Sequence, residues 1–328
     1  MHNPFDETRS KETIENSKSA LENKPSVNLF LVSKTTSKSK DPHHYSVYTV
    51  DIAGEVPDYF RGIIKNELER LTNDDEIKYR EFFDINASSN EVRIMSINDD
   101  VMGFNSILND IEHFVDLPPF NGIDKIKDIW AYAIEIEFNN DKLIYFRKYT
   151  ASRIISKKGM TTIFYKDKLN KVRGDILAFD DVIDCIYYQS LGSIMILDKE
   201  KFENIFNFNE FYRLRSVKTL KRLSNLIDID RKMIEDASLK TRTSRKITEL
   251  SMSGRLESEY VRDLIKNKFF EKHKTELPMI MTYGIINGKI KIDDIKSLDA
   301  FLDTCAENYL KGLASENKYR TEHKERIS

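Results

Sequence analysis

Cysteine is scarce in this chain, and its scarcity excludes several kinds of site. Cys185 and Cys305 lie far apart and match no ligand spacing of a zinc site. Both occur among apolar residues, which predicts buried free thiols. So few cysteines in 328 residues are typical of a reducing compartment.

Long apolar runs are also missing. No stretch approaches the roughly 20 apolar residues that span a bilayer. The first 26 residues have no apolar core and do not resemble a secretory signal. We therefore expect a cytoplasmic protein, which would reach the inner face of the membrane only through a partner.

Glycine and histidine are too sparse or too scattered to form the common catalytic motifs. Eleven glycines form no phosphate-binding loop, nucleophile elbow or kinase signature. The six histidines show no H-x-x-x-H or H-E-x-x-H spacing. We therefore assign no catalytic residue, no metal ligand and no cofactor, and a non-enzymatic role is favoured without being settled.

Charge, in contrast, is abundant and unevenly distributed. Residues 51–142 hold 21 acidic and 9 basic residues, a net charge of −12. Residues 143–255 hold 23 basic and 14 acidic residues, a net charge of +9. Such asymmetry indicates either that the basic part binds a polyanion or that the two parts attract each other within a fold or a dimer.

Alternating apolar residues predict an antiparallel sheet in the first two thirds of the chain. Residues 130–138 (WAYAIEIEF) and 142–149 (KLIYFRKY) flank the turn Asn139-Asn140-Asp141 and read as a hairpin. Residues 58–71 show helical spacing, with Asp58 as the expected N-cap. After Phe202 the spacing becomes helical, and the final helix is expected over residues 297–310.

These patterns predict an α+β fold, with a largely antiparallel sheet and flanking helices followed by a helical C-terminal region. The expected parts are a flexible or weakly packed helical segment at 1–26, an α+β domain at 27–209, a helical region with basic clusters at 210–312 and a charged tail at 313–328.

Two basic clusters are the candidate nucleic-acid contacts. Arg215, Lys218 and Arg222 stand at i, i+3 and i+7 of an expected helix and share a face, with Leu214, Val217 and Leu220 as the anchors opposite. Cations and hydroxyls together suit phosphate oxygens, although a run of charge is also typical of a solvated face. The full set of candidates is Arg213, Arg215, Lys218, Lys221, Arg222, Lys240, Arg242, Arg245 and Lys246.

Carboxylates offer an alternative, a metal-dependent nuclease. Glu135 and Glu137 lie on one face of an expected strand near lysines, and Asp180, Asp181 and Asp184 form a short acidic group. The E-x-K spacing of restriction-type nucleases is absent, and aspartates are common in turns. The aromatic residues between Tyr187 and Tyr212 could stack on bases, but their density favours core packing.

The stretch from 172 to 215 resembles the core of the KwaB family of the Kiwa anti-phage defence system of bacteria. The matching residues are Asp180 to Tyr187, Ser193 to Leu197, Lys201, Phe202, Glu203, Ile205 and Phe206. The resemblance implies a cytoplasmic protein that binds DNA without an evident nuclease centre and works with a membrane-embedded partner, KwaA.

Composition and resemblance together predict a DNA-binding defence protein. We expect it to bind double-stranded DNA through phosphates with little sequence preference, together with a KwaA-like membrane protein. A homo-oligomer is expected, with a dimer favoured. The remaining alternative is an interaction subunit whose basic helix docks on an acidic partner without binding DNA.

Overall fold

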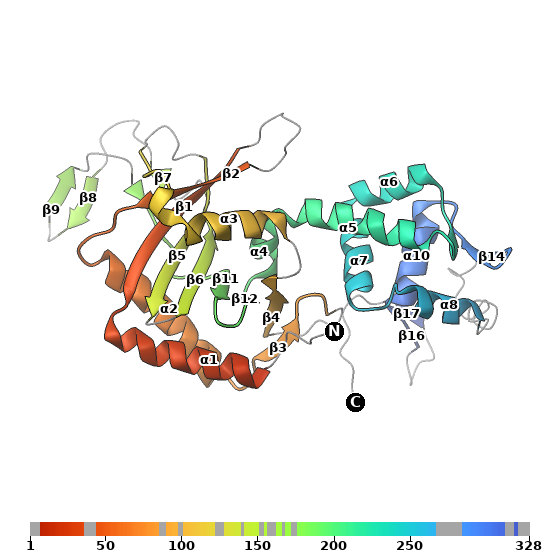
Figure 1. The fold of residues 1–328 in the computed structure, drawn as a ribbon, viewed down its shortest axis with the longest axis horizontal. Helices are drawn as coiled ribbons and strands as arrows, with labels where there is room; N and C mark the ends of the chain where they lie inside the picture. Colours follow the sequence, from red (N-terminus) through yellow and green to blue (C-terminus); the bar gives the residue numbers. More distant parts are fainter. Residues whose placement is uncertain are drawn as a thin grey trace. The chain divides into compact units, whose positions relative to one another are not determined.

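The protein divides into two compact units in a computed structural model (Figure 1). Unit 1 comprises Met1–Phe82 and Asn90–Asn207, and unit 2 comprises Phe83–Ser89 and Phe208–Ser328. The structure describes residues 7–35, 44–84, 90–97, 101–121, 128–138, 141–150, 154–155, 162–165, 168–171, 176–266, 284–311 and 318–320.

Unit 1 is built on an eight-stranded sheet with the strand order β2-β1-β5-β6-β11-β12-β4-β3. All neighbours are antiparallel except β3 and β4. The strands are β1 Ser26–Thr35, β2 His44–Val50, β3 Lys78–Glu81, β4 Glu91–Ser96, β5 Ile129–Phe138, β6 Asp141–Lys148, β11 Cys185–Tyr188 and β12 Ser193–Ile196. The largely antiparallel sheet expected from alternation is confirmed.

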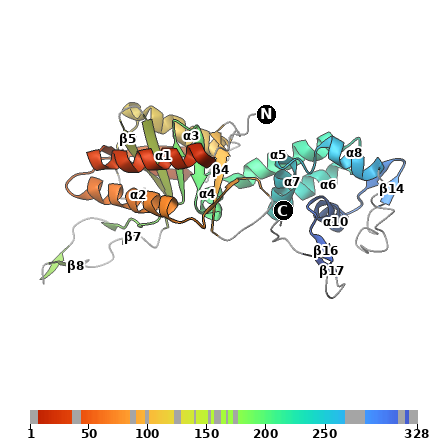
Figure 2. The same cartoon turned by 90° about the horizontal axis from the view of Figure 1, so that it is seen from below.

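Helices cover both faces of this sheet (Figures 1 and 2). Helices α1 (Glu7–Ala20) and α2 (Val56–Asn73) share one apolar core with Tyr132, Ile134 and Ile136 of β5. On the other face are α3 (Met102–Glu112) and α4 (Lys199–Ile205), and Phe104 of α3 packs edge-to-face on Phe146. Because both faces are covered, residues 131–136 are buried without interruption.

The N-terminal segment packs more closely than its composition suggests. Helix α1 buries Ser10, Ile14 and Ser17, and Leu21 is buried in the 3-10 turn that follows; these positions recur every three or four residues, so one stripe of a polar helix faces the core. Helix α2 begins at Val56 with Glu55 as N-cap, so Asp58 lies inside its first turn. The expectation for Asp58 was wrong because Pro57 itself fits the first turn of a helix.

Unit 2 is mainly helical. Its helices are α5 Phe208–Leu223, α6 Arg231–Leu239, α7 Thr241–Met252, α8 Ser258–Lys266 and α10 Ile295–Cys305. A small sheet, absent from the sequence prediction, has the order β13-β15-β14 and comprises β13 Ile227–Asp228, β15 Lys289–Lys291 and β14 Gly284–Ile286. The apolar core of unit 2 includes Leu220, Ile247, Ile290 and Phe301. The α+β fold with a helical C-terminal region is confirmed.

Short strands and one helix end complete the comparison with the sequence. Each of three strand pairs forms a small two-stranded sheet among the described residues. They are β7 Ile154–Ile155 with β10 Ile176–Leu177, β8 Thr162–Tyr165 with β9 Lys168–Lys171, and β16 Tyr309–Lys311 with β17 Lys318–Arg320. Leu310 therefore lies in a strand, and the final helix ends at Cys305, five residues before its expected end. That helix starts at a capping box between Asp294 and Ser297.

Candidate nucleic-acid interface

The expected basic helix is α5, but its buried face differs from the expected one. Tyr212, Ser216, Thr219, Leu220 and Leu223 are buried. Leu214, expected to be an anchor, is 46% exposed. Ser216 and Thr219 can lie in the interface because their hydroxyls bond to Arg213 O and Ser251 Oγ, which satisfies them without water.

The three residues predicted to share a phosphate-facing side of α5 have different surroundings. Arg222 donates to Glu257 Oε1 at 3.0 Å and to the carbonyl of Leu256 at 3.1 Å. Arg215 reaches the sulfur of Met252 at 3.1 Å. Lys218 is exposed and forms no ion pair among the residues described. Arg222 and Arg215 therefore tie α5 to residues 252–257, whereas Lys218 remains available.

The other cations of α5 divide in the same way. Arg213 is paired with Glu210, three residues earlier on the helix, and this bond raises the pKa of Arg213. Lys221 is exposed, and no described residue forms an ion pair with it. The outer surface of α5 thus presents Lys218 and Lys221 beside the exposed Leu214.

The second basic cluster surrounds the turn between α6 and α7. Lys240 alone separates the two helices and is exposed, as are Thr241 and Arg242. The N-terminus of α7 has no side-chain cap, so its first backbone N–H groups can donate outward. Deeper in α7, Arg245 pairs with Glu249 at 3.2 Å, and Lys246 pairs with the buried Asp303 of α10.

The nine candidates are therefore not equivalent. Arg213, Arg222, Arg245 and Lys246 are engaged by carboxylates of unit 2 itself, not of the acidic stretch 51–142. Ion pairs between residues three or four positions apart on one helix can be predicted from the sequence. The Arg222–Glu257 and Lys246–Asp303 pairs join distant segments, and no spacing rule predicts them. Contact of any of the nine with DNA stays a prediction.

The carboxylates of the nuclease alternative are held by structural partners. Glu135 is fully buried and accepts hydrogen bonds from Asn28 Nδ2 at 3.0 Å and Lys142 Nζ at 3.3 Å. Its neighbour Glu137 is exposed. Within the described part of the chain, no group of three or more His, Cys, Asp or Glu side chains is placed to hold a metal ion.

The acidic group at 180–184 also has a structural role. Arg147 pairs with both Asp180 and Asp184, and the backbone N–H of Lys148 donates to Asp184 at 2.6 Å. Burial raises the pKa of Asp184, while the Lys148 N–H and Arg147 act in the opposite direction. The exposed Asp181 accepts a bond from the hydroxyl of Tyr59 at 2.9 Å. This network joins β6 to the start of β11.

The aromatic residues pack in the cores, as the sequence favours. In unit 1, Phe202 and Phe206 pack edge-to-face with ring centroids 5.1 Å apart. In unit 2, Phe208 and Tyr212 are buried against each other. The prediction of buried free thiols is also confirmed, since both cysteines are free and buried, and burial raises the pKa of each.

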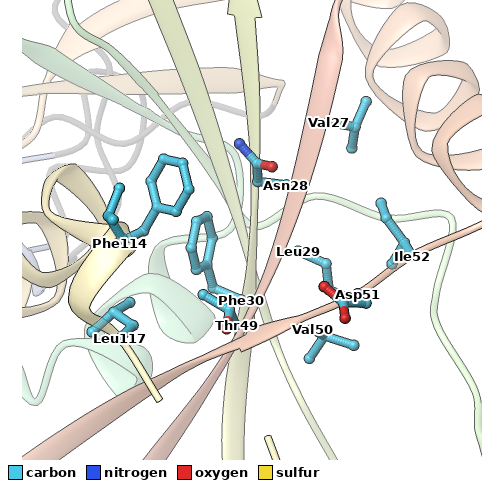
Figure 3. Close-up of a pocket in the computed structure, with 11 residues that line it drawn as sticks. Val27, Asn28, Leu29, Phe30, Thr49, Val50, Asp51, Ile52, Phe114 and Leu117 are labelled. Carbon is cyan, nitrogen blue, oxygen red and sulfur yellow. The ribbon is translucent and has the colours of Figure 1, made fainter. Parts of the chain in front are cut away.

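An open pocket of about 430 Å³ lies along β1 in unit 1 (Figure 3). Phe30 and Phe114 meet edge-to-face on one side of β1, and Val27 and Ile52 lie on its other side. Asp51 is the one ionisable residue among its lining residues, and the Asn28 amide is already bonded to Glu135. The pocket lacks the convergent polar groups of a catalytic site.

The fold and these surfaces define an α+β protein whose second unit presents exposed cations on helices. A family model described as Kiwa protein KwaB-like matches residues 126–313, more than half of the chain. The chain therefore belongs to the KwaB-like family, which links it to Kiwa anti-phage defence. This confirms the resemblance found in the sequence.

Comparison with curated proteins and with solved structures found no match.

A membrane-crossing helix would need a long apolar segment, and none of the helices in the described ranges has the required length and composition.

Proposed function

We propose that this KwaB-like protein binds double-stranded DNA during anti-phage defence, through the phosphate backbone and with little sequence preference. The observation that carries the proposal is that three of the nine candidate cations, Lys218, Lys221 and Lys240, are exposed and have no ion-pair partner among the described residues. An unpaired exposed lysine can neutralise a phosphate and release its counterion without first giving up a carboxylate.

The paired cations have a second role in this proposal. Arg213, Arg222, Arg245 and Lys246 would have to exchange a carboxylate for a phosphate, which reduces the gain from each contact. They hold α5, α7 and α10 in position, so that the free lysines and the uncapped start of α7 keep a fixed spacing. Backbone N–H groups at such a helix start are themselves phosphate ligands.

The first test is binding of the full chain to two 30-base-pair duplexes of unrelated sequence, measured by fluorescence anisotropy from 50 to 200 mM salt. We expect similar affinities for the two duplexes and a steep loss with salt, because phosphate contacts carry no sequence information. A strong preference for one duplex, or no binding at 50 mM salt, would contradict the proposal.

The proposal extends to partners. We infer a cytoplasmic protein that acts with a KwaA-like membrane protein and forms a homodimer, supported by family membership and by the opposite net charges of residues 51–142 and 143–255. Co-purification with the membrane protein encoded beside it tests the first inference, and light scattering tests the second. Co-purification without DNA binding would favour the interaction-subunit alternative.

A further inference from the structure

Lys34 and Lys148 of unit 1 lie against the ring of the single tryptophan of the chain, and the charge of a third lysine, Lys201, acts on Lys148. Lys34 is the penultimate residue of β1, Lys148 ends β6, and Lys201 lies in α4. The ammonium of Lys148 lies 3.4 Å from the centroid of the Trp130 ring, and that of Lys34 lies 4.5 Å from it. All three lysines are half-buried.

A β-bulge brings Trp130 into this position. The pairing of β1 with β5 shifts between Val32, which faces Ala131, and Ser33, which faces Ile129, so Trp130 is the extra residue. Its indole N–H donates to the carbonyl of Ile205 at 3.1 Å, and the hydroxyl of Tyr45 donates to the same carbonyl at 2.9 Å. These bonds fix the end of α4 against the sheet, so the three lysines are held by rigid elements.

The cluster lacks a counter-charge. Among the described residues, no carboxylate forms an ion pair with Lys34, Lys148 or Lys201. Asp184, whose charge acts on Lys148, is fully buried and is bonded to Arg147 and to the backbone N–H of Lys148. Lys148 itself donates to the carbonyls of Trp130 and Tyr149 at 2.7 and 3.2 Å.

The electrostatic consequence appears at Lys148. The pKa of Lys148 is lowered to about 8, mainly by burial and also by the neighbouring charges of Lys34 and Lys201, against a smaller opposing effect of Asp184. Burial also lowers the pKa of Lys34. Cations held together without an anion destabilise the folded state, and a bound anion removes that repulsion.

We propose that Lys34, Lys148 and Lys201 form an anion site that binds a phosphate group, the phosphate being that of a free nucleotide or of a nucleic-acid backbone. Lys34 and Lys201 can supply N–H donors from separate elements, and the charge of Lys148 adds to theirs; this suits a phosphate better than a monovalent halide, because a phosphate carries more charge and several acceptor oxygens. The site lies in unit 1, apart from the lysines of unit 2 to which DNA binding is assigned, and it stands independently of that assignment.

Trp130 provides the readout, because no other tryptophan contributes to the emission. Inorganic pyrophosphate is added to the full chain at constant ionic strength and pH 7, with excitation at 295 nm. We expect a saturable change in Trp130 emission. In a Lys34→Gln, Lys201→Gln variant the apparent affinity should fall by at least about tenfold, since hydrogen bonds to charged groups contribute roughly 1.5–3 kcal/mol each.

The matched control is Lys24→Gln, Lys65→Gln, which removes the same charge from two exposed positions of unit 1 and should leave the affinity unchanged. Binding should also weaken as pH rises above 8, by up to about tenfold per pH unit, because the neutral amine of Lys148 holds no anion. No saturable response to 10 mM pyrophosphate, or an equal loss in the control, would overturn the proposal.

Two further titrations distinguish the source of the phosphate. If a nucleoside triphosphate saturates the Trp130 signal and a duplex leaves it unchanged, the site takes a free nucleotide. If the duplex changes the signal and added pyrophosphate raises the duplex concentration that gives half of that change, the site takes the backbone. A variant lacking Lys218, Lys221 and Lys240 should keep its pyrophosphate response, so failure of the unit 2 assignment would be recognised separately.

Discussion

Lys148 is a side chain that the fold half-buries. The sequence shows only a lysine at the end of an alternating strand, and such positions are usually solvated. The bulge at Trp130 and the position of α4 cover it, and neither is visible in an alternating pattern. Its altered ionisation is therefore a consequence of tertiary structure that strand periodicity cannot predict.

The pH dependence of stability follows from that ionisation. The pKa of Lys148 is about 8 in the folded protein and near 10.4 in an unfolded chain. Between these values the unfolded state binds more protons, so the contribution of Lys148 to the free energy of unfolding rises with pH. The test is the urea midpoint of the wild type minus that of Lys148→Met, measured in phosphate-free buffer. This difference should increase between pH 7.5 and pH 9.5.

The comparison needs a lysine in ordinary surroundings. Lys65 of α2 is exposed, and Lys65→Met should show the same difference from the wild type at both pH values. A wild-type advantage over Lys148→Met that does not change with pH would show that Lys148 ionises as it does in the unfolded chain.

Among the elements, α3 depends on a close approach to the end of α4. A Cβ at Gly103 would lie 2.7 Å from the carbonyl oxygen of Phe206 and 3.1 Å from the ring of Tyr45. Gly103→Ala should therefore destabilise unit 1 by about 1–3 kcal/mol, because neither the backbone nor the buried ring can move freely. Chemical denaturation measures the change.

Gly62 of α2 is the matched position. A Cβ there meets no atom within 4 Å, so Gly62→Ala should stabilise by about 0.5–1 kcal/mol through helix propensity alone. If Gly103→Ala stabilised the protein as Gly62→Ala is expected to, the packing of α3 against residue 206 would be wrong.

The elements also show where sequence patterns are sufficient. Alternation located β5 and β6 because their inward residues on one face are large and apolar. It could not show that α3 and α4 cover the other face, where Ala131 and Ala133 are as buried as Ile134. Alternation did not predict the hairpin of β14 and β15, whose strands have only three residues each. Asn287 and Gly288 both have positive φ, which is typical of a tight hairpin turn.

For the whole molecule, local patterns predicted the fold class and the family, while the candidate interface depends on contacts between distant segments. Nine cations looked equivalent in sequence. Folding pairs Arg222 with Glu257 and Lys246 with Asp303 and leaves Lys218, Lys221 and Lys240 exposed. A charge count over residues 143–255 cannot make this distinction, because it contains no information on which carboxylates lie close to which cations in the folded chain.

The central claim is that these three lysines contact DNA phosphates. Its most direct test is the slope of log Kd against log salt concentration for two triple variants. The first carries Lys218→Gln, Lys221→Gln and Lys240→Gln together. The second, a control with an equal change of charge in unit 1, carries Lys24→Gln, Lys65→Gln and Lys78→Gln. The account predicts that the first variant lowers the slope by about 2.7, at about 0.9 for each lost phosphate contact, and that the second leaves it unchanged. Equal slopes in the wild type and both variants would contradict it.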